Sequence, residues 1–549
     1  MPDTTSTHRR SLRRITTVKD QRRHVGAAWW QQYLCASFVL VIVSLAAAAT
    51  APQPFAVALL ALLLCTSALL FNPVIGVYLI AFFTMASDAA VAPWYPFVKN
   101  FSSAESILYV ADPLTFSPLE VLVIATATSW LIRSQVNGAR VSFRGGKMFV
   151  PLTLFTGMVV VGFANGVIRR GGDLRIAIFE GRALFLILVV YLLIVNVFTS
   201  RRHYITLFVV ALVGVFVQSI VALIFYRNLE DGLRGDLDSL TEHGASVHLA
   251  VLFILTLCLI FLPKCSSRFR WTALTFCIPA IIVFALSQRR SAFNAFAIAM
   301  VLFLAVLFIE RRRAFWWLAP TLTVFGVGYV LAFWSVTGPL GFGAQAVKSF
   351  IAPEQLDAVD RSSDLYREIE ATNIWFTIRA EPELGVGFGN RFYQPWALPD
   401  LGPGFEFRDF LPHNSLLWIW LKTGYVGFVL MLFVLARTIQ LGTRSIARVK
   451  DGDERAILVA CLSYIVMYTV FTYVDIGWDA RSVVFLSMAM AWCADSADVE
   501  AREAVDPPVP ITEHTLHLVA SIQPAPPESI AAPVGSRPTS TGPHLSNRS

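Results

Sequence analysis

Apolar runs of about membrane-spanning length follow one another along most of this 549-residue chain. A helix needs about 20 residues to cross the hydrocarbon core of a bilayer. About fourteen runs reach or approach that length, and twelve is the cautious count. They lie at 33–50, 54–71, 74–90, 117–133, 149–165, 182–199, 204–226, 245–263, 271–287, 291–309, 314–334, 414–436, 456–474 and 480–495. Since a segment in lipid must satisfy its own backbone hydrogen bonds, we predict an all-α polytopic integral membrane protein with about 12–14 transmembrane helices.

The composition agrees with a membrane protein, because 56% of residues are hydrophobic and only 15% are charged. A soluble globular chain is much less apolar. The net charge of +7 resides mostly between the apolar runs, which indicates topology and membrane lipids rather than a nucleic-acid partner. The seven cysteines show no CxxC or finger-like spacing. We therefore expect neither a disulfide framework nor a zinc site.

The basic segments predict which loops face the cytoplasm, since cytoplasmic loops are rich in Lys and Arg. The N-terminal segment "HRRSLRRITTVKDQRRH" is placed inside, and strict alternation then puts five further loops inside. All five are basic: "RSQVNGARVSFRGGK", "TSRRHY", "PKCSSRFR", "ERRRAFWW" and "ARTIQLGTRSIARVKDGDER". Both termini are then cytoplasmic, and the long segment 335–413 is extracytoplasmic.

The domain organisation follows from these assignments and from the polar tails. We expect a disordered basic N-terminus at 1–27 and a disordered Pro/Ser-rich tail at 497–549. Between them lie transmembrane helices at 28–334, the extracytoplasmic loop at 335–413 and the last transmembrane helices at 414–496. Within the loop, "RSSDLYREIEATNIWFTIRAEP" has helical periodicity and predicts an amphipathic helix that ends near Pro382.

Several arginines fall on the predicted outer side, at or just inside the apolar boundary. An arginine at that depth costs free energy unless it has a partner. The bland explanation is that these side chains reach lipid headgroups or pair with Glu180, Asp173, Asp231 or Asp236. We favour it for Arg169, Arg170 and Arg227, and we keep Arg175, Arg182 and Arg234 as candidates for binding an anionic ligand.

The turn "SQRRSAF" differs, because it contains no acidic neighbour of Arg289 and Arg290. The turn is also too short to lift either side chain far from the membrane. A guanidinium fork matches phosphate oxygens well. We therefore predict that Arg290, assisted by Arg289, binds an anionic ligand.

A histidine closes the long outer loop, directly before an apolar run. His413 is followed by Asn414, which is well suited to cap the next helix and to fix the orientation of the histidine. His413 is then either a structural residue at a helix start or a general base with a pKa near working pH. A metal centre is not expected, because His243 and His248 lack the i, i+4 spacing of a helical metal site.

Three segments carry a resemblance to a known family. "EPELGVGFGNRF" followed by "PHNSLLWIWLKTGYVGFVLML" resembles the signature of the O-antigen ligase and O-antigen polymerase superfamily. "LSQRRSAFNAF" is similar to the arginine turn of that family, and "GLRGDLDSLTEHGASVHLA" resembles its preceding arginine-containing outer segment. Two departures are the second arginine, Arg289, and the insertion "PDLGPGFEFRD". The three glycines of "GVGFGNRF" are not a nucleotide-binding loop, because no βαβ unit fits around them; we expect a flexible turn there.

The resemblance implies a metal-independent, inverting glycosyltransferase without a cofactor, with a helical fold related to the C-type glycosyltransferases. Its donor would be a polyprenyl-pyrophosphate-linked glycan, and its acceptor a glycan or glycolipid at the outer face of the bacterial cytoplasmic (inner) membrane. His413 would be the catalytic base, and the pyrophosphate would be bound by Arg290, Arg289 and Arg234, with Arg182 and Arg175 as further candidates. Asn414 and Asp475 would support the site.

Two other classes of function are compatible with the same sequence. A flippase for lipid-linked oligosaccharides would also have about fourteen helices and membrane arginines, although it would require charges along a central cavity. A non-catalytic membrane scaffold is the other class. Within the enzyme interpretation, a polymerase and a ligase differ in their acceptor, which these motifs do not specify.

Overall fold

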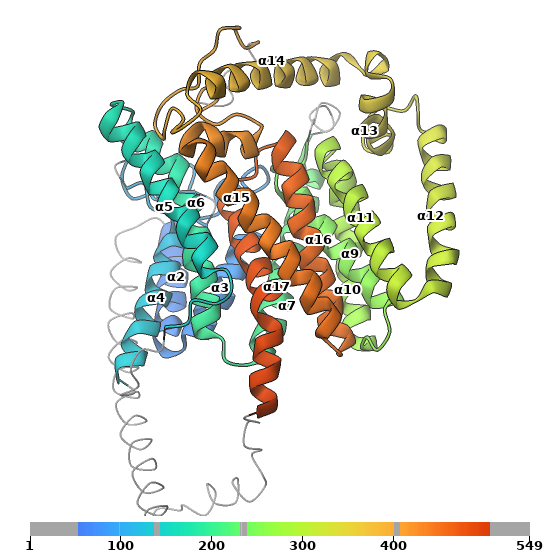
Figure 1. Cartoon of the computed structure of the whole chain (residues 1–549), viewed down its shortest axis with the longest axis horizontal. Helices are drawn as coiled ribbons and strands as arrows, with labels where there is room; N and C mark the ends of the chain where they lie inside the picture. The colour runs from blue at the N-terminus through green and yellow to red at the C-terminus, as the bar shows by residue number, and fades with distance from the viewer. Residues whose placement is uncertain are drawn as a thin grey trace, which may run out of the picture. The chain divides into compact units, whose positions relative to one another are not determined.

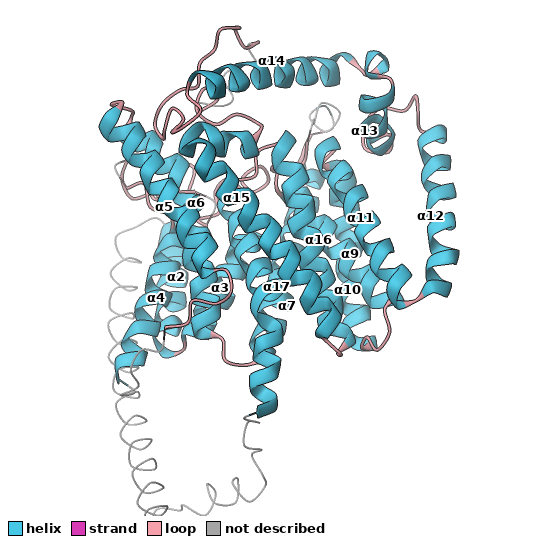
Figure 2. Cartoon of the chain, viewed as in Figure 1, coloured by secondary structure: helices cyan, strands magenta, loops and turns pink. Residues whose placement is uncertain are grey.

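The structure is a computed structural model that describes residues 53–97, 99–112, 114–136, 143–230, 232, 239–399 and 407–505. Helices make up all of the regular secondary structure in these ranges, joined by loops (Figure 2). The predicted span 33–50 and both predicted tails, 1–27 and most of 497–549, lie outside them.

The described helices carry the labels of Figure 1. In chain order they are α2 (Gln53–Phe71), α3 (Pro73–Ala86), α4 (Pro118–Val136), α5 (Phe149–Phe163), a π-helix (Ala164–Arg169), α6 (Leu174–Val197), α7 (Arg201–Asn228), α9 (Ala245–Phe261), α10 (Ser267–Leu286), α11 (Arg290–Glu310), α12 (Arg312–Ala332), α13 (Phe342–Ile351), a 3₁₀-helix (Pro353–Gln355), α14 (Ala358–Ala380), α15 (Ser415–Arg448), α16 (Gly452–Val474) and α17 (Ala480–Val505).

The apolar pattern predicted these helices well. Each of the thirteen expected spans after residue 52 lies largely within one of them. Nine of the described helices are long and apolar enough to cross a membrane, and α3 and α9 are shorter apolar helices. The fold class, an all-helical polytopic membrane protein, is confirmed.

Basic connections gather at one end of the helix bundle. Arg201, at the start of α7, pairs with Asp451 at 3.1 Å and Glu454 at 2.8 Å, and Arg455 pairs with Glu310 at 2.6 Å. The connections that follow α6, α11 and α15 therefore meet. Their surroundings expose many further cations: Arg202, Lys264, Arg268, Arg311, Arg312, Arg313, Arg444, Arg448 and Lys450.

The opposite end of the bundle carries the segment between α12 and α15. Its main element is α14, which lies across the ends of the bundle helices, whereas α12 stands at the side of the bundle (Figure 1). Asp357 caps α14 by accepting a hydrogen bond from the Asp360 N–H, and the helix ends at Ala380, just before Pro382, as its sequence predicted. The buried face of α14 includes Tyr366 and Glu370.

The glycine segment 385–389 is buried rather than free. Gly385, Gly387 and Gly389 all have positive φ, between 65° and 78°, and Phe388 is fully buried. The Val386 N–H donates to the Leu421 carbonyl of α15 at 2.8 Å. The expectation of a flexible turn was wrong, because this segment packs tightly between α5, α6 and α15.

We expect Gly387→Ala to destabilise the protein by roughly 1–2 kcal/mol or more, because a residue with a Cβ is strained at this φ of 76°. A Cβ at Gly387 would also meet the backbone of Gly166 and the Gly162 carbonyl. Gly157→Ala in α5 is the matched control, since a Cβ there meets nothing within 4 Å. Thermal unfolding of the detergent-purified variants measures the difference. Equal melting temperatures for the two variants would contradict this account of the segment.

One buried ion pair holds the glycine segment between two helices. Lys422 of α15 and Glu180 of α6 lie 2.7 Å apart, and their side chains are at most 1% exposed. The Gly389 N–H donates to Glu180 Oε2 at 2.7 Å, and Lys422 Nζ donates to the Asn390 carbonyl at 2.7 Å. The two charges thus satisfy each other, and they also bind the backbone of Gly389 and of Asn390, the residue directly after the segment.

Candidate active site

A cavity of about 580 Å³ opens between α6, α14, α15 and the loops that precede α9 and α17. It lies at the opposite end of the bundle from the basic connections. The helix α16 begins at Gly452, beside those connections, and ends at Val474, just before Ile476 of the cavity lining. Its polar lining is rich in ionisable side chains: Glu120, Glu180, Arg182, Glu242, His243, Tyr366, Arg408, His413 and Asp479. Cavities with such convergent polar groups are the usual places for binding or catalysis.

His413 is fixed in this cavity by its neighbours on both sides. Asn414 caps α15, and its side-chain oxygen accepts a hydrogen bond from the Leu417 N–H at 2.9 Å, as predicted. Glu370 of α14 accepts a hydrogen bond from the His413 backbone N–H at 2.9 Å and contacts Nδ1 of the ring at 3.2 Å. Since an ionised carboxylate only accepts, the contact assigns a proton to Nδ1. Nε2 is then the ring atom that a substrate can reach.

Tyr366 completes the surroundings of His413. Its ring stands edge-on to the imidazole, with 5.5 Å between the centroids. Burial and the charge of Glu370 raise the pKa of Tyr366 to about 12. The phenol therefore stays protonated at neutral pH and remains a hydrogen-bond donor.

A second histidine–carboxylate pair faces the first. His243 Nδ1 lies 2.5 Å from Oδ1 of Asp475, and the rings of His243 and His413 are 6.2 Å apart. Asp475 is fully buried and accepts a further hydrogen bond from Ser291 Oγ at 2.8 Å. The sequence predicts that Asp475 supports the site, and the carboxylate of Asp475 contacts His243 rather than His413.

The electrostatics of Asp475 favour its charged form. Burial raises the pKa of this carboxyl, but the charge and hydrogen bond of His243, together with the charges of Arg367 and Arg289, outweigh burial and hold the pKa well below its usual value. Asp475 therefore remains a carboxylate throughout the physiological pH range.

Arg182 is the predicted arginine that lines the cavity. It extends from α6, where its guanidinium donates to Asn100 Oδ1 at 2.6 Å and to the Thr115 carbonyl at 2.8 Å. Glu120 lies 3.9 Å away and the Phe179 ring 5.3 Å away. These contacts fix the guanidinium at the wall of the cavity.

Arg290 lies outside the cavity lining and has acidic partners after all. It is the first residue of α11 and makes a two-pronged contact with Asp364 of α14, at 2.8 and 3.0 Å, with Asp360 at 3.3 Å. The turn itself has no acidic neighbour, as its sequence indicates, but tertiary packing supplies two carboxylates from α14. Arg289 is the residue before α11, and its charge acts on Asp475.

The other two predicted arginines are placed as follows. Arg175 is exposed in the first turn of α6 and is not part of the cavity lining described above. Arg234 lies outside the described residues. Of the five arginines predicted to bind pyrophosphate, the structure thus brings Arg182 to the cavity of His413, and the charge of Arg289 acts on Asp475, the partner of His243.

Comparison with known proteins gave a family match for the part of the chain that contains α11 to α14 and His413. Residues 274–432 match the model of a family described as O-antigen ligase. This region belongs to the O-antigen ligase family. A search of curated proteins gave no match to the chain.

The O-antigen ligase region contains some of the site but not all of it. Arg290, Glu370 and His413 lie inside the matched residues, whereas Arg182, His243 and Asp475 lie outside them. The cavity is therefore assembled from the matched region together with α6, the loop before α9 and the turn after α16.

Glu370 is a residue of this candidate site that reasoning from the sequence missed. One signal for it was present: Tyr366, Glu370 and Asn373 recur at helical spacing and share the buried side of α14. A glutamate at such a position requires a partner. His243 was considered only as a metal ligand, because its partner Asp475 is 232 residues away in the sequence.

Proposed function

We propose that this protein transfers a glycan from a polyprenyl-pyrophosphate donor to an acceptor glycan or glycolipid at the outer face of a bacterial inner membrane. The observation that carries the proposal is the shared cavity of His413 and Arg182, in which each side chain is held by named partners. Membership of residues 274–432 in the O-antigen ligase family supports glycan ligation or polymerisation as the reaction class.

The orientation in the membrane is part of the proposal. Exposed Lys and Arg residues surround the connections at one end of the bundle, and the cavity belongs to the other end. Cytoplasmic loops carry the excess of Lys and Arg. The cavity then opens on the extracytoplasmic side, where a lipid-linked pyrophosphate is a suitable activated donor because it needs no soluble nucleotide sugar.

In the proposed reaction, His413 acts on the acceptor hydroxyl and Arg182 acts on the leaving pyrophosphate. Nε2 of His413 removes the proton from an acceptor hydroxyl, and Glu370 stabilises the imidazolium that forms. The acceptor oxygen attacks the anomeric carbon of the donor, and the bond from that carbon to the pyrophosphate oxygen breaks. Arg182 stabilises the charge that develops on the pyrophosphate, since fixed donors aimed at developing charge lower the barrier most effectively. The step inverts the anomeric configuration and needs no metal ion.

Arg290 takes a supporting part in this scheme. Its guanidinium is engaged by Asp364 and Asp360, so a phosphate group would have to compete with two carboxylates for it. The same helix, α14, carries Glu370, which holds His413. We infer that the contact of Arg290 with α14 positions this helix, and thereby His413.

Arg182→Gln tests the substrate side of the proposal. Purified protein is given a polyprenyl-pyrophosphate oligosaccharide and an acceptor in the presence of a chelator. The wild type is expected to transfer glycan, and Arg182→Gln to lower kcat/KM by about 10- to 100-fold, because one hydrogen bond to a charged group contributes about 1.5–3 kcal/mol.

Arg444→Gln, an exposed arginine on the basic end of α15, is the control and should retain the wild-type rate. A chelator-sensitive wild type would contradict the metal-independent scheme. An Arg182→Gln variant with wild-type kinetics would remove Arg182 from the reaction. The length of the product separates a polymerase from a ligase.

A further inference from the structure

His243 repeats, on the facing wall of the cavity, the arrangement of His413. In each case Nδ1 is engaged by a buried carboxylate, that of Asp475 or of Glu370, and the imidazole lines the cavity. The side chain of His243 is 33% exposed, whereas that of Asp475 is fully buried. The carboxylate therefore lies behind the ring, and Nε2 is the polar atom that His243 can present to a bound molecule.

We propose that His243 is a second catalytic residue, which acts as an imidazolium paired with the Asp475 carboxylate and whose Nε2–H donates a hydrogen bond to the pyrophosphate oxygen that leaves the anomeric carbon. This assignment rests on the proposed transfer reaction and deepens it. Asp475 is a positioning residue in this scheme, because it acts on the substrate only through His243.

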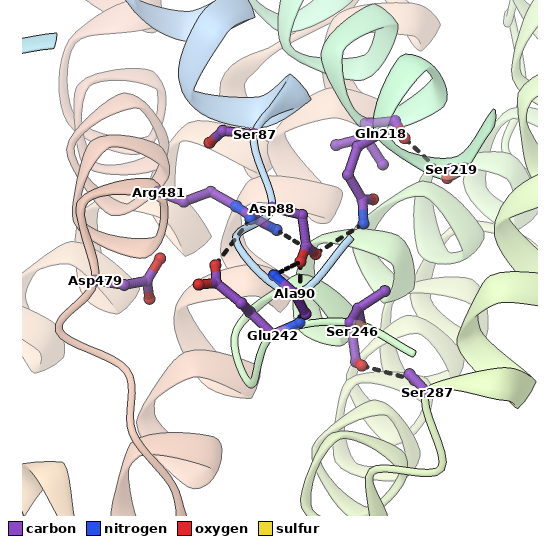
Figure 3. A network of polar contacts seen from close by, with 12 residues as sticks. Ser87, Asp88, Ala90, Gln218, Ser219, Glu242, Ser246, Ser287, Asp479 and Arg481 are labelled. Atoms are coloured by element: carbon purple, nitrogen blue, oxygen red, sulfur yellow. Dashed lines mark hydrogen bonds and ion pairs between the residues drawn. The ribbon is translucent and has the colours of Figure 1, made fainter. Parts of the chain in front are cut away.

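A network of polar contacts fixes the segment that carries His243 (Figure 3). The Glu242 N–H donates to Asp88 Oδ1 at 3.2 Å, and Arg481 contacts Glu242 at 3.2 Å and Asp88 at 3.4 Å. Gln218 of α7 donates to Asp88 at 3.0 Å. The start of α9 is thereby tied to α7, to α17 and to the segment after α3. Such anchoring presents the His243 ring in one position, as a catalytic group requires.

The surroundings place His243 on the side of the leaving group. Its partner Asp475 accepts a hydrogen bond from Ser291, the second residue of α11. The positive charges of Arg289 and Arg367 also act on Asp475. The positive end of the dipole of α11 lies at this point, and helix N-termini attract phosphate groups. His413, by contrast, is surrounded by Glu370 and Tyr366, which suit a neutral hydroxyl acceptor.

The spacing of the two rings fits a displacement between them. Their centroids are 6.2 Å apart, slightly less than the about 6.5–9.5 Å that separates the two catalytic carboxyl groups of inverting glycosidases, which act on opposite faces of the sugar. During transfer the acceptor proton passes to His413 and then to water. The electron pair of the breaking C–O bond passes to the pyrophosphate oxygen, which remains an anion stabilised by the Nε2–H of His243. No oxidant, reductant or further reactant is needed.

The test combines kinetics with binding of a sugar-free polyprenyl pyrophosphate, which is the leaving group itself. His243→Ala is expected to weaken this binding by about tenfold or more, since one hydrogen bond to a charged group contributes that factor. It should lower kcat by a similar factor and leave the KM of the acceptor unchanged. His243→Gln keeps an amide donor near the position of Nε2 and should recover part of both losses. Asp475→Asn should also weaken the binding of the sugar-free lipid and lower kcat, and it should leave the KM of the acceptor unchanged.

The outcomes separate this inference from the proposed function. Wild-type binding and kcat in His243→Ala and His243→Gln would overturn it, and so would a rise in the acceptor KM alone. His203→Gln, at the basic end of the bundle, is the matched histidine control. Binding is measured without turnover. A wild type that binds the sugar-free lipid through His243 but transfers nothing would therefore refute the transfer reaction alone.

Discussion

His413→Gln is expected to lower the rate of glycan transfer by about 10²- to 10⁴-fold, which is the usual contribution of a general base. Glutamine can still form a hydrogen bond at the position of the ring, but it cannot take up a proton. The fold should survive, because His413 is only partly buried and its backbone N–H can still donate to Glu370. Initial rates with purified enzyme and saturating donor measure the effect.

A graded series makes this prediction sharper. Glu370→Gln should cost less than His413→Gln, because it weakens the support of the imidazolium but leaves the base in place. His203→Gln should retain the wild-type rate. If His413→Gln kept the wild-type rate while its melting temperature was normal, His413 would be the structural residue at a helix start that its sequence position also allows.

Lys422→Met is expected to destabilise the protein by about 3–5 kcal/mol, because it leaves the charge of Glu180 buried without its partner. The two side chains are 2.7 Å apart and almost completely buried. Lys422 Nζ also donates to the Asn390 carbonyl, so the residue directly after the glycine segment loses a contact at the same time. Unfolding of the purified protein in detergent, induced by heat or denaturant, measures the loss.

The double variant shows whether the charge itself is responsible. Glu180→Gln combined with Lys422→Met removes both charges but keeps an amide oxygen that can accept the Gly389 N–H. It should be more stable than Lys422→Met alone. Lys450→Met, at an exposed position after α15, should change little. A single Lys422→Met variant that unfolds like the wild type would show that the pair contributes no net stability.

Local sequence patterns predicted the elements of this fold. Apolar runs predicted the helices, because a helix in lipid satisfies the hydrogen bonds of its own backbone whatever its neighbours are. Asn414 capped α15 as expected, and Pro382 followed the end of α14. One detail of α15 was missed: Gly424 has a φ of 70°, so the helix is interrupted there.

Partners that are distant in the sequence set the limit of such prediction. His413 was predicted as a candidate general base because it directly precedes a helix and lies within a recognisable motif. Its partner Glu370 belongs to another helix 43 residues earlier, and the Asp364 partner of Arg290 is 74 residues away. Only tertiary packing brings these carboxylates to their cations, so the acidic environment of Arg290 could not be anticipated from its own turn.

The central claim is that this cavity transfers glycan rather than moving a lipid across the membrane. The most direct measurement reconstitutes the wild type in liposomes with a labelled polyprenyl-pyrophosphate oligosaccharide and an acceptor, and follows both products at once. We predict that labelled glycan appears on the acceptor and that sugar-free polyprenyl pyrophosphate is released in equal amount. Movement of the intact labelled lipid to the other leaflet, without any transfer, would contradict the account and identify a transporter.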